Sequence, residues 1–293
     1  MSWQAQLLDG VALPLKRRMR VDVERQTRRA LEKQAKPVGL PKLKGVDVRR
    51  TASHGMDAYE LTPTGATPTR TVFYVHGGSY LFRAASVQWR FIARVAVEAG
   101  VRVVAPDYPL APGTTAAETV DRVASVLGDL PESEPVVVLG DSAGGGLALA
   151  ITQELRDWGA KLPERVVLIA PWLDLSTSDP AQPAMQDGDI MLTVEGLQAA
   201  GRLYAGELPV TDPRVSPLYG DLHDLPPVSV FVGTSDLLVH DARALARRAA
   251  EIGSAVDVVE AEGMQHVYPM LPLLPEAKAA RRQIVELIRR PPG

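Results

Sequence analysis

The fold of this chain is decided by one stretch, Leu139-Gly140-Asp141-Ser142-Ala143-Gly144-Gly145-Gly146. A β-branched run at 136–138 precedes it and helix-prone residues at 147–150 follow it, which predicts a strand, a sharp turn and a helix. Gly140 and Gly144 flank Ser142 in a G-x-S-x-G arrangement, which is typical of a nucleophile elbow. Such a turn lifts the serine hydroxyl above the sheet. The flanking positions must then lack a Cβ, because strand and helix nearly touch there.

The length and composition of the chain are those of one large α/β domain. Of its 293 residues, 46% are hydrophobic and 23% are charged, so a substantial core can be buried. The formal net charge of −3 gives no reason to expect a nucleic acid or an anionic membrane as a partner. The absence of cysteine excludes disulfides and thiolate metal sites, and it fits a cytoplasmic protein.

The N-terminal region lacks the pattern of a secretory signal. Its basic cluster, Lys16-Arg17-Arg18, follows the short apolar segments at 7–8 and 11–13 instead of preceding them. No apolar run approaches the ~18 residues that span a bilayer. We therefore expect a cytoplasmic location without stable membrane insertion.

Strand and helix patterns alternate along most of the chain. Strands are expected at 46–48, 58–61, 71–75, 101–105, 136–139, 166–170, 228–232 and 256–259, the first two of them antiparallel. Helices are expected near 86–99, 115–129, 146–158, 241–252 and 274–290. Continuous apolar strands separated by helices predict a mostly parallel sheet with helices on both faces, within a single domain over residues 1–293.

Two segments depart from this alternation and predict a helical cap. Residues from about 3 to 35 have the pattern of an amphipathic helix, whose arginines are interpreted as a solvated face. Between Asp174 and Pro213 the alternation stops, with a loop at 181–192 and helical spacing at 193–206. An open sheet places its ligand crevice there, outside the carboxyl ends of the strands. We therefore expect a cap from about 1–45 and about 178–212; an ordinary surface excursion is the alternative.

A glycine pair directly after the strand at 71–75 predicts an oxyanion hole. In His76-Gly77-Gly78-Ser79, backbone N–H groups can point into a cleft with no side chain in the way. His76 is interpreted as a residue that shapes this loop. The N–H of Ala143, directly after the serine, is expected to be a further donor.

The chain order serine, acid, histidine selects the remaining catalytic candidates. His266 lies in a loop after the last expected strand, whereas His54 and His76 come too early in the chain. Asp236 follows the strand at 228–232 and is the preferred acid. The alternative, Asp241, has the position of a residue in the first turn of the next helix, where its charge meets the helix dipole.

With these residues, the chain resembles the hormone-sensitive-lipase-like esterases, the bacterial family IV branch of the α/β-hydrolases. The resemblance runs from about residue 70 to 270, and it is carried by 76–78, 107–112, 140–145, 236–238 and His266. It implies carboxylic ester hydrolysis of short or medium acyl chains, without a cofactor or a metal, by Ser142, Asp236 and His266. It also implies an oxyanion loop of Gly77, Gly78 and Ser79, and a small-molecule ester as the partner. Members often form dimers, so both a monomer and a homodimer stay open.

The sequence departs from the family pattern at three positions. Ser79 replaces the usual third glycine, which puts the size of the acyl pocket in question but leaves an N–H for the oxyanion. Pro109 and Gly113 stand where the family commonly has arginine and glutamate. A lactonase or a deacetylase with the same three residues stays open. A non-catalytic small-molecule receptor on this scaffold is disfavoured, because such receptors lose the histidine.

Overall fold

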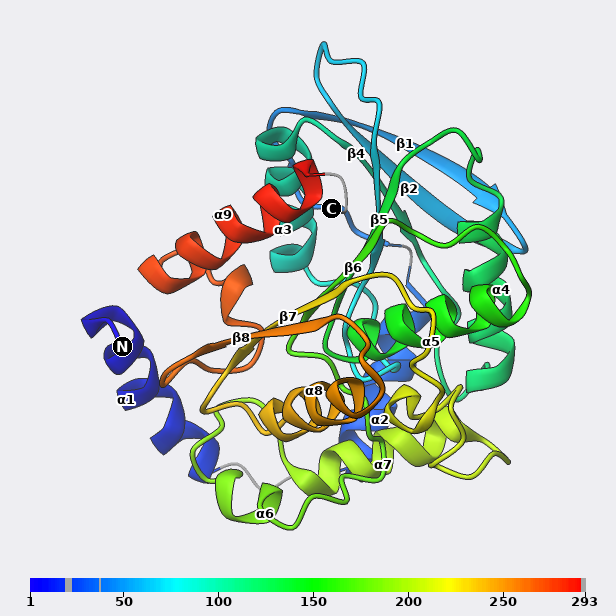
Figure 1. The fold of residues 1–293 in the computed structure, drawn as a ribbon. Coiled ribbons are helices and arrows are strands. Elements are labelled where there is room, and N and C mark those ends of the chain that lie inside the picture. The colour runs from blue at the N-terminus through cyan, green and yellow to red at the C-terminus, as the bar shows by residue number, and fades with distance from the viewer. Residues whose placement is uncertain (19–22, 37, 291–293) are drawn as a thin grey trace.

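The computed structural model describes residues 1–18, 23–36 and 38–290, and within these ranges eight strands form one sheet (Figure 1). Its order is β1-β2-β4-β3-β5-β6-β7-β8. The strands are β1 (Val46–Ser53), β2 (Met56–Pro63), β3 (Thr71–Val75), β4 (Arg102–Pro106), β5 (Val136–Asp141), β6 (Arg165–Ile169), β7 (Val228–Gly233) and β8 (Val256–Ala261). Strand β2 pairs antiparallel with both β1 and β4, and the other five pairs are parallel, which confirms the expected mostly parallel sheet.

Helices cover both faces of the sheet. On one face α3 (Ser86–Ala99) packs against α9 (Pro275–Arg289). On the other lie α4 (Ala116–Gly128), α5 (Ala143–Asp157) and α8 (Val239–Ile252). The residues of β3, β5 and β7 are all buried, because strands covered on both faces favour continuous apolar sequences such as Val136-Val137-Val138-Leu139.

The register of the central strands determines where the serine lies. Val75 pairs with Gly140, and Asp141 pairs with Ile169, so β3, β5 and β6 end side by side. The turn that holds Ser142 is therefore at the carboxyl edge of the sheet and near its middle. Loops that follow the other parallel strands open onto the same edge.

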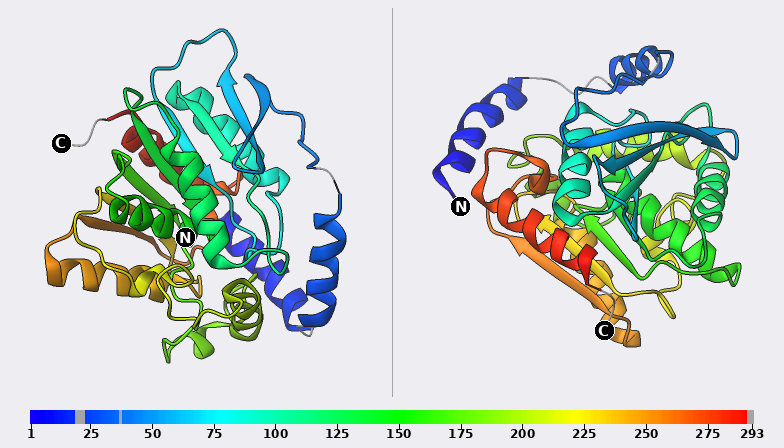
Figure 2. Two further views of the ribbon diagram at one scale, coloured as in Figure 1. Left: turned by 90° about the vertical axis from the view of Figure 1, so that its right-hand side faces the viewer. Right: turned by 90° about the horizontal axis from the view of Figure 1, so that it is seen from above.

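Four further helices gather in the lower part of the molecule in Figure 1 and in the left view of Figure 2. They are α1 (Trp3–Arg18), α2 (Val23–Gln34), α6 (Gln182–Met185) and α7 (Val194–Ala205). The expected helix over 3–35 is thus divided into α1 and α2, and the side chains of Arg17, Arg18 and Arg20 lie outside the described residues. The short helix α6 occupies a segment that was expected to be a loop.

Contacts place these helices above the loops of the carboxyl edge. The Gln34 amide donates to the carbonyl oxygens of Leu81 and Ala111 at 2.8 and 2.9 Å. The Tyr204 ring on α7 stacks on Tyr80, with centroids 3.6 Å apart. The boundaries of a separate cap stay a prediction. In the described part of the chain, no helix combines the length and the apolar character that crossing a membrane requires.

Candidate active site

Ser142 occupies the sharp turn between β5 and α5. Its backbone has φ 53° and ψ −124°, a strained conformation for a residue with a side chain. A Cβ on Gly140 would lie 2.3 Å from the Gly144 carbonyl oxygen, and one on Gly144 would lie 2.2 Å from that of Val75. The glycines are therefore required by close backbone approach, as the sequence pattern predicts.

Helix α5 begins at Ala143, three residues before the expected start near 146. The three glycines at 144–146 have a low helix propensity, which favoured the later start. Packing reverses that preference, because a Cβ on Gly146 would lie 2.2 Å from the Trp172 carbonyl oxygen. The glycines let the first turn of the helix lie against the neighbouring loop.

The structure brings the three predicted residues Ser142, His266 and Asp236 together as a hydrogen-bonded triad, a row in which His266 lies between the other two. Ser142 Oγ lies 2.9 Å from His266 Nε2, and His266 Nδ1 lies 2.8 Å from Asp236 Oδ2. Asp236 Oδ1 accepts a hydrogen bond from the Leu238 N–H at 2.8 Å. Ser142 is 9% exposed and Asp236 is fully buried, so the row is shielded from water except at the serine.

The charges around His266 favour its protonated form. Burial of the imidazole opposes protonation, and the charge and hydrogen bond of Asp236 favour it; the net effect of its surroundings raises the pKa of His266 above 6.5. The carboxylates of Asp189 and Asp141 add to this effect. An imidazolium that forms when His266 accepts a proton is thus stabilised.

Asp241, the alternative acid, has a different environment. It lies in the first turn of α8, as its position in the sequence indicated, and it is buried. Its Oδ2 accepts hydrogen bonds from the N–H groups of Leu173 and Asp174 at 2.8 and 2.9 Å. Burial raises the pKa of Asp241 to about 8. This carboxyl holds the loop after β6, and Asp236 is the acid that contacts His266.

The glycine loop after β3 is held by Asp141, the residue before the serine. Asp141 Oδ1 accepts from the Tyr74 hydroxyl at 2.5 Å and from the Gly77 N–H at 3.0 Å, and its Oδ2 accepts from the Gln88 amide at 2.9 Å. Gly77 was expected among the oxyanion donors. Its N–H is instead engaged by Asp141, because the carboxylate reaches across from β5.

The N–H groups of Gly78, Ser79 and Ala143 have no hydrogen-bond acceptor among the described residues. A Cβ on Gly78, which has φ 134°, would lie 2.4 Å from the Phe82 carbonyl oxygen, so only glycine fits there. Ser79 has φ 54°, in the region that favours glycine. Ala143 is the first residue of α5, where helix N–H groups lack intrahelical partners. These three N–H groups are free to donate hydrogen bonds to an oxyanion.

His76 shapes the loop, as its position predicted. Its Nδ1–H donates to the Gly77 carbonyl oxygen at 2.8 Å, and its ring stacks on Tyr108 with centroids 4.3 Å apart. Burial lowers the pKa of His76 to about 4, so the ring is neutral at pH 7. The importance of Asp141 and Gln88 was missed at the level of sequence. The signal that could have found Asp141 was a charged residue at an otherwise apolar strand end.

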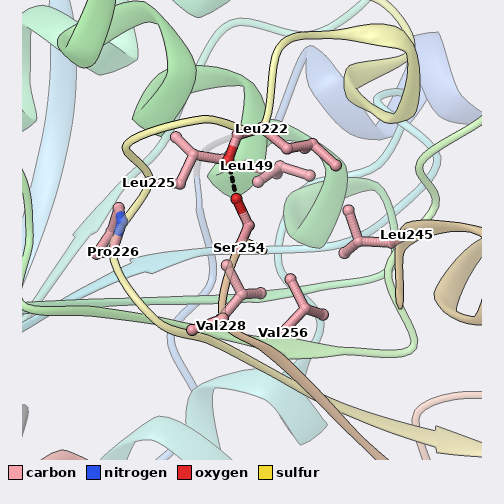
Figure 3. A pocket seen from close by; sticks show the side chains of 9 residues that line it. Leu149, Leu222, Leu225, Pro226, Val228, Leu245, Ser254 and Val256 are labelled. Atoms are coloured by element: carbon pink, nitrogen blue, oxygen red, sulfur yellow. Dashed lines mark hydrogen bonds between the residues drawn. The ribbon is translucent and has the colours of Figure 1, made fainter. Parts of the chain in front are cut away.

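Apolar residues in the loop after β6 and in the loop between α6 and α7 have mixed environments. Trp172 and Leu173 are fully buried, while Met191 is 56% exposed. A small cavity lies at the edge of the sheet opposite to Ser142. Its lining includes Leu222, Val228, Ser254 and Val256 (Figure 3). Because Val228 and Val256 begin β7 and β8, this cavity lies at the amino edge and away from Ser142.

Comparison with known proteins agrees with this geometry. The profile of a family described as the alpha/beta hydrolase fold matches residues 72–270. An esterase of Acinetobacter venetianus is 29% identical over 259 residues, covering 86% of this chain and 81% of that protein. An acetyl-hydrolase of Streptomyces hygroscopicus is 36% identical over 218 residues, or 72% of each chain.

The similarity extends to solved structures. The crystal structure of an esterase from the bacterial hormone-sensitive lipase family covers 100% of this chain at 29% identity, with a TM-score of 0.85 and 99% of that chain matched. Both its sheet and its additional helices are therefore included in the match. The chain thus belongs to the α/β-hydrolase fold family and is a carboxylic ester hydrolase of its hormone-sensitive-lipase-like branch.

Proposed function

We propose that the protein is a serine carboxylesterase that hydrolyses short- to medium-chain acyl esters through Ser142, His266 and Asp236 and an acyl-enzyme intermediate. The observation that carries this proposal is the pair of distances of 2.9 and 2.8 Å in the row from Ser142 Oγ through His266 to Asp236. A serine hydroxyl is a weak nucleophile until a base accepts its proton, and this row supplies an oriented base.

The reaction takes place in two steps. Ser142 Oγ attacks the ester carbonyl carbon while His266 Nε2 accepts the hydroxyl proton. The tetrahedral intermediate then loses the alcohol, which takes the proton from His266. Water attacks the acyl-enzyme in the second step, with His266 again accepting and returning a proton, so that the carboxylic acid leaves and Ser142 is restored.

The N–H groups of Gly78, Ser79 and Ala143 stabilise the negative oxygen in each step. Their lack of another acceptor in the described residues supports this role, while the Gly77 N–H keeps the loop in place through Asp141. Each such donor contributes about 10²–10³-fold to the rate in related chemistry.

We expect the enzyme to prefer esters with a short acyl group. The Streptomyces hygroscopicus relative is named an acetyl-hydrolase, and we infer that the Ser79 side chain narrows the acyl pocket, because it replaces a glycine that is usual in this family. Acetylated alcohols are therefore a second substrate class beside simple alkyl esters. The cytoplasmic location stays a prediction from composition.

A panel of p-nitrophenyl esters from acetate to decanoate, with lactones and acetylated alcohols added, tests the proposal. We expect turnover to fall sharply beyond short chains, and Ser142→Ala to lower kcat by about 10⁶-fold with the fold intact. Labelling by a fluorophosphonate should occur in the wild type and not in this variant. Near-normal turnover by Ser142→Ala contradicts the proposal, and equal turnover of long chains contradicts the acyl preference.

A further inference from the structure

A buried carboxylate from the insertion, the stretch between Asp174 and Pro213 where the strand–helix alternation stops, contacts the loop that holds Asp236. Asp189, in the loop between α6 and α7, is fully buried. Its Oδ2 accepts a hydrogen bond from the Leu237 N–H at 3.0 Å, and Leu237 is the residue after Asp236. Its Oδ1 accepts from the N–H groups of Met191 and Leu192 at 2.7 Å each. Asp189 thus joins its own loop to the loop that holds the acid.

The residue before the base is bound to the same segment. The Gln265 Oε1 accepts from the Ile190 N–H at 3.0 Å, and its Nε2 donates to the Gly188 carbonyl oxygen at 3.0 Å. The same amide nitrogen donates to Asp9 Oδ1 on α1 at 3.1 Å. Gln265 itself is 3% exposed, whereas its three hydrogen bonds are part-buried because their partners lie nearer the surface.

Three consecutive residues, 188–190, therefore bond both to the neighbour of Asp236 and to the neighbour of His266. We propose that this segment is a positioning clamp, in which Asp189 and Gln265 fix the acid loop against the base loop and α1 contributes through Asp9. The clamp rests on the proposed function of Asp236 and His266, since it acts on their geometry. Asp189 and Gln265 are positioning residues, because neither contacts the serine or the expected substrate.

Backbone strain beside His266 is consistent with a clamp. Val267 has φ 51°, a conformation that is strongly disfavoured for a β-branched residue. Such strain persists only where surrounding contacts over-determine the backbone. The three hydrogen bonds of the Gln265 side chain are such contacts, two residues before Val267.

The charge of Asp189 gives the clamp a second effect. Burial raises the pKa of Asp189, and the charge of Asp236 raises it further. Asp189 in turn raises the pKa of His266, together with Asp236 and Asp141, the other carboxylates that act on the imidazole. Removing the Asp189 charge should therefore lower the pKa of His266, whereas removing the Gln265 amide should leave it unchanged.

The decisive variant is Asp189→Asn, which keeps the shape but places an amide donor against a backbone N–H. We expect kcat for p-nitrophenyl acetate to fall by up to about 10²-fold, as small misplacements of catalytic groups do, with KM unchanged. The acid limb of the pH–rate profile should move to lower pH. The matched control is Asp187→Asn, which removes the same charge from an exposed position in the same loop and should change neither quantity.

Variants of Gln265 and Asp9 separate the effect of geometry from the effect of the Asp189 charge. Gln265→Met keeps the length of the side chain without its hydrogen bonds, so we expect a lower kcat with the acid limb unmoved. Asp9→Ala should lower kcat less, and Asp9→Asn should restore it because its carbonyl oxygen still accepts from Gln265. The folded fraction of every variant is measured by thermal unfolding and near-ultraviolet circular dichroism.

Wild-type kcat and an unmoved acid limb in folded Asp189→Asn overturn the proposal. If Asp189→Asn does not fold, the test uses the folded variants Gln265→Met and Asp9→Ala. A wild-type kcat in both of these variants overturns the proposal. A loss of activity that only matches the loss of folded protein also overturns it. Failure of the proposed function is recognised separately, because Ser142→Ala would then keep its activity in a chain with an intact clamp.

Discussion

The carboxylate of Asp141 accepts a hydrogen bond from the N–H of Gly77 at 3.0 Å, across the two central strands β5 and β3. This bond joins the serine turn to the glycine loop, so the proposed nucleophile and the proposed oxyanion donors are held in fixed relative positions. Catalysis by such donors depends on their being fixed before the reaction begins. Loss of this bond should therefore lower kcat, separately from any effect on the stability of the fold.

Asp141→Ala removes the carboxylate that accepts from Tyr74, Gly77 and Gln88, and it leaves Ser142 and His266 in place. We expect kcat to fall by up to about 10²–10³-fold, the effect of losing an oxyanion donor. Asp141→Asn keeps one oxygen for Tyr74 and Gly77, so its loss should be smaller. Steady-state kinetics with p-nitrophenyl acetate measure both, and a wild-type kcat in folded Asp141→Ala would show that the bond to Gly77 does not affect turnover.

Asp236 and Asp241 should separate in their effects on rate and stability. Asp236→Asn removes the acceptor that orients His266, and we expect kcat to fall by about 10⁴-fold, as in other serine hydrolases. Asp241→Ala removes the bonds to the Leu173 and Asp174 N–H groups and should lower the midpoint of thermal unfolding with a much smaller change in kcat. The reverse pattern would assign the acid to Asp241.

The raised pKa of His266 predicts opposite trends of activity and stability with pH. Activity requires the neutral imidazole, so kcat/KM should rise with pH to a midpoint above 6.5. The folded pKa lies above the unfolded value, so the stabilisation from this group is fully present below about pH 6.5 and is lost as pH rises through the folded pKa. Rate profiles and urea unfolding across pH 5–9 test both trends. A midpoint below 6.5 would contradict the expected environment of His266.

Ser79 is the residue through which acyl-chain length should be altered. Ser79→Gly keeps the N–H and suits the φ of 54°, so turnover of p-nitrophenyl acetate should be preserved. Turnover of octanoate relative to acetate should rise, because the loop loses a side chain. Ser79→Ala is the control that removes only the hydroxyl and keeps the Cβ. No change in chain-length preference in Ser79→Gly would remove Ser79 from the acyl pocket.

Local patterns predicted most of the fold. The strand at 71–75 and the helix at 86–99 have the expected bounds, because β-branched runs and helical apolar spacing are properties of neighbouring residues. The start of α5 was wrong, because the low helix propensity of its glycines is outweighed by packing against the loop at 171–172. The short helix α6 contains Pro183 and has too few residues to give a periodic signal.

For the site, the sequence by itself determined which residues were candidates. The G-x-S-x-G turn, the glycine loop and the order serine, aspartate, histidine are encoded in types and spacing, since close approach and strain allow few alternatives there. Only the tertiary structure decided that Asp141 engages the Gly77 N–H, and that the segment 188–190 bonds to both Leu237 and Gln265. These partners lie 48 to 75 residues apart. Contacts of that kind depend on how the loops pack at the sheet edge, which local propensity does not encode.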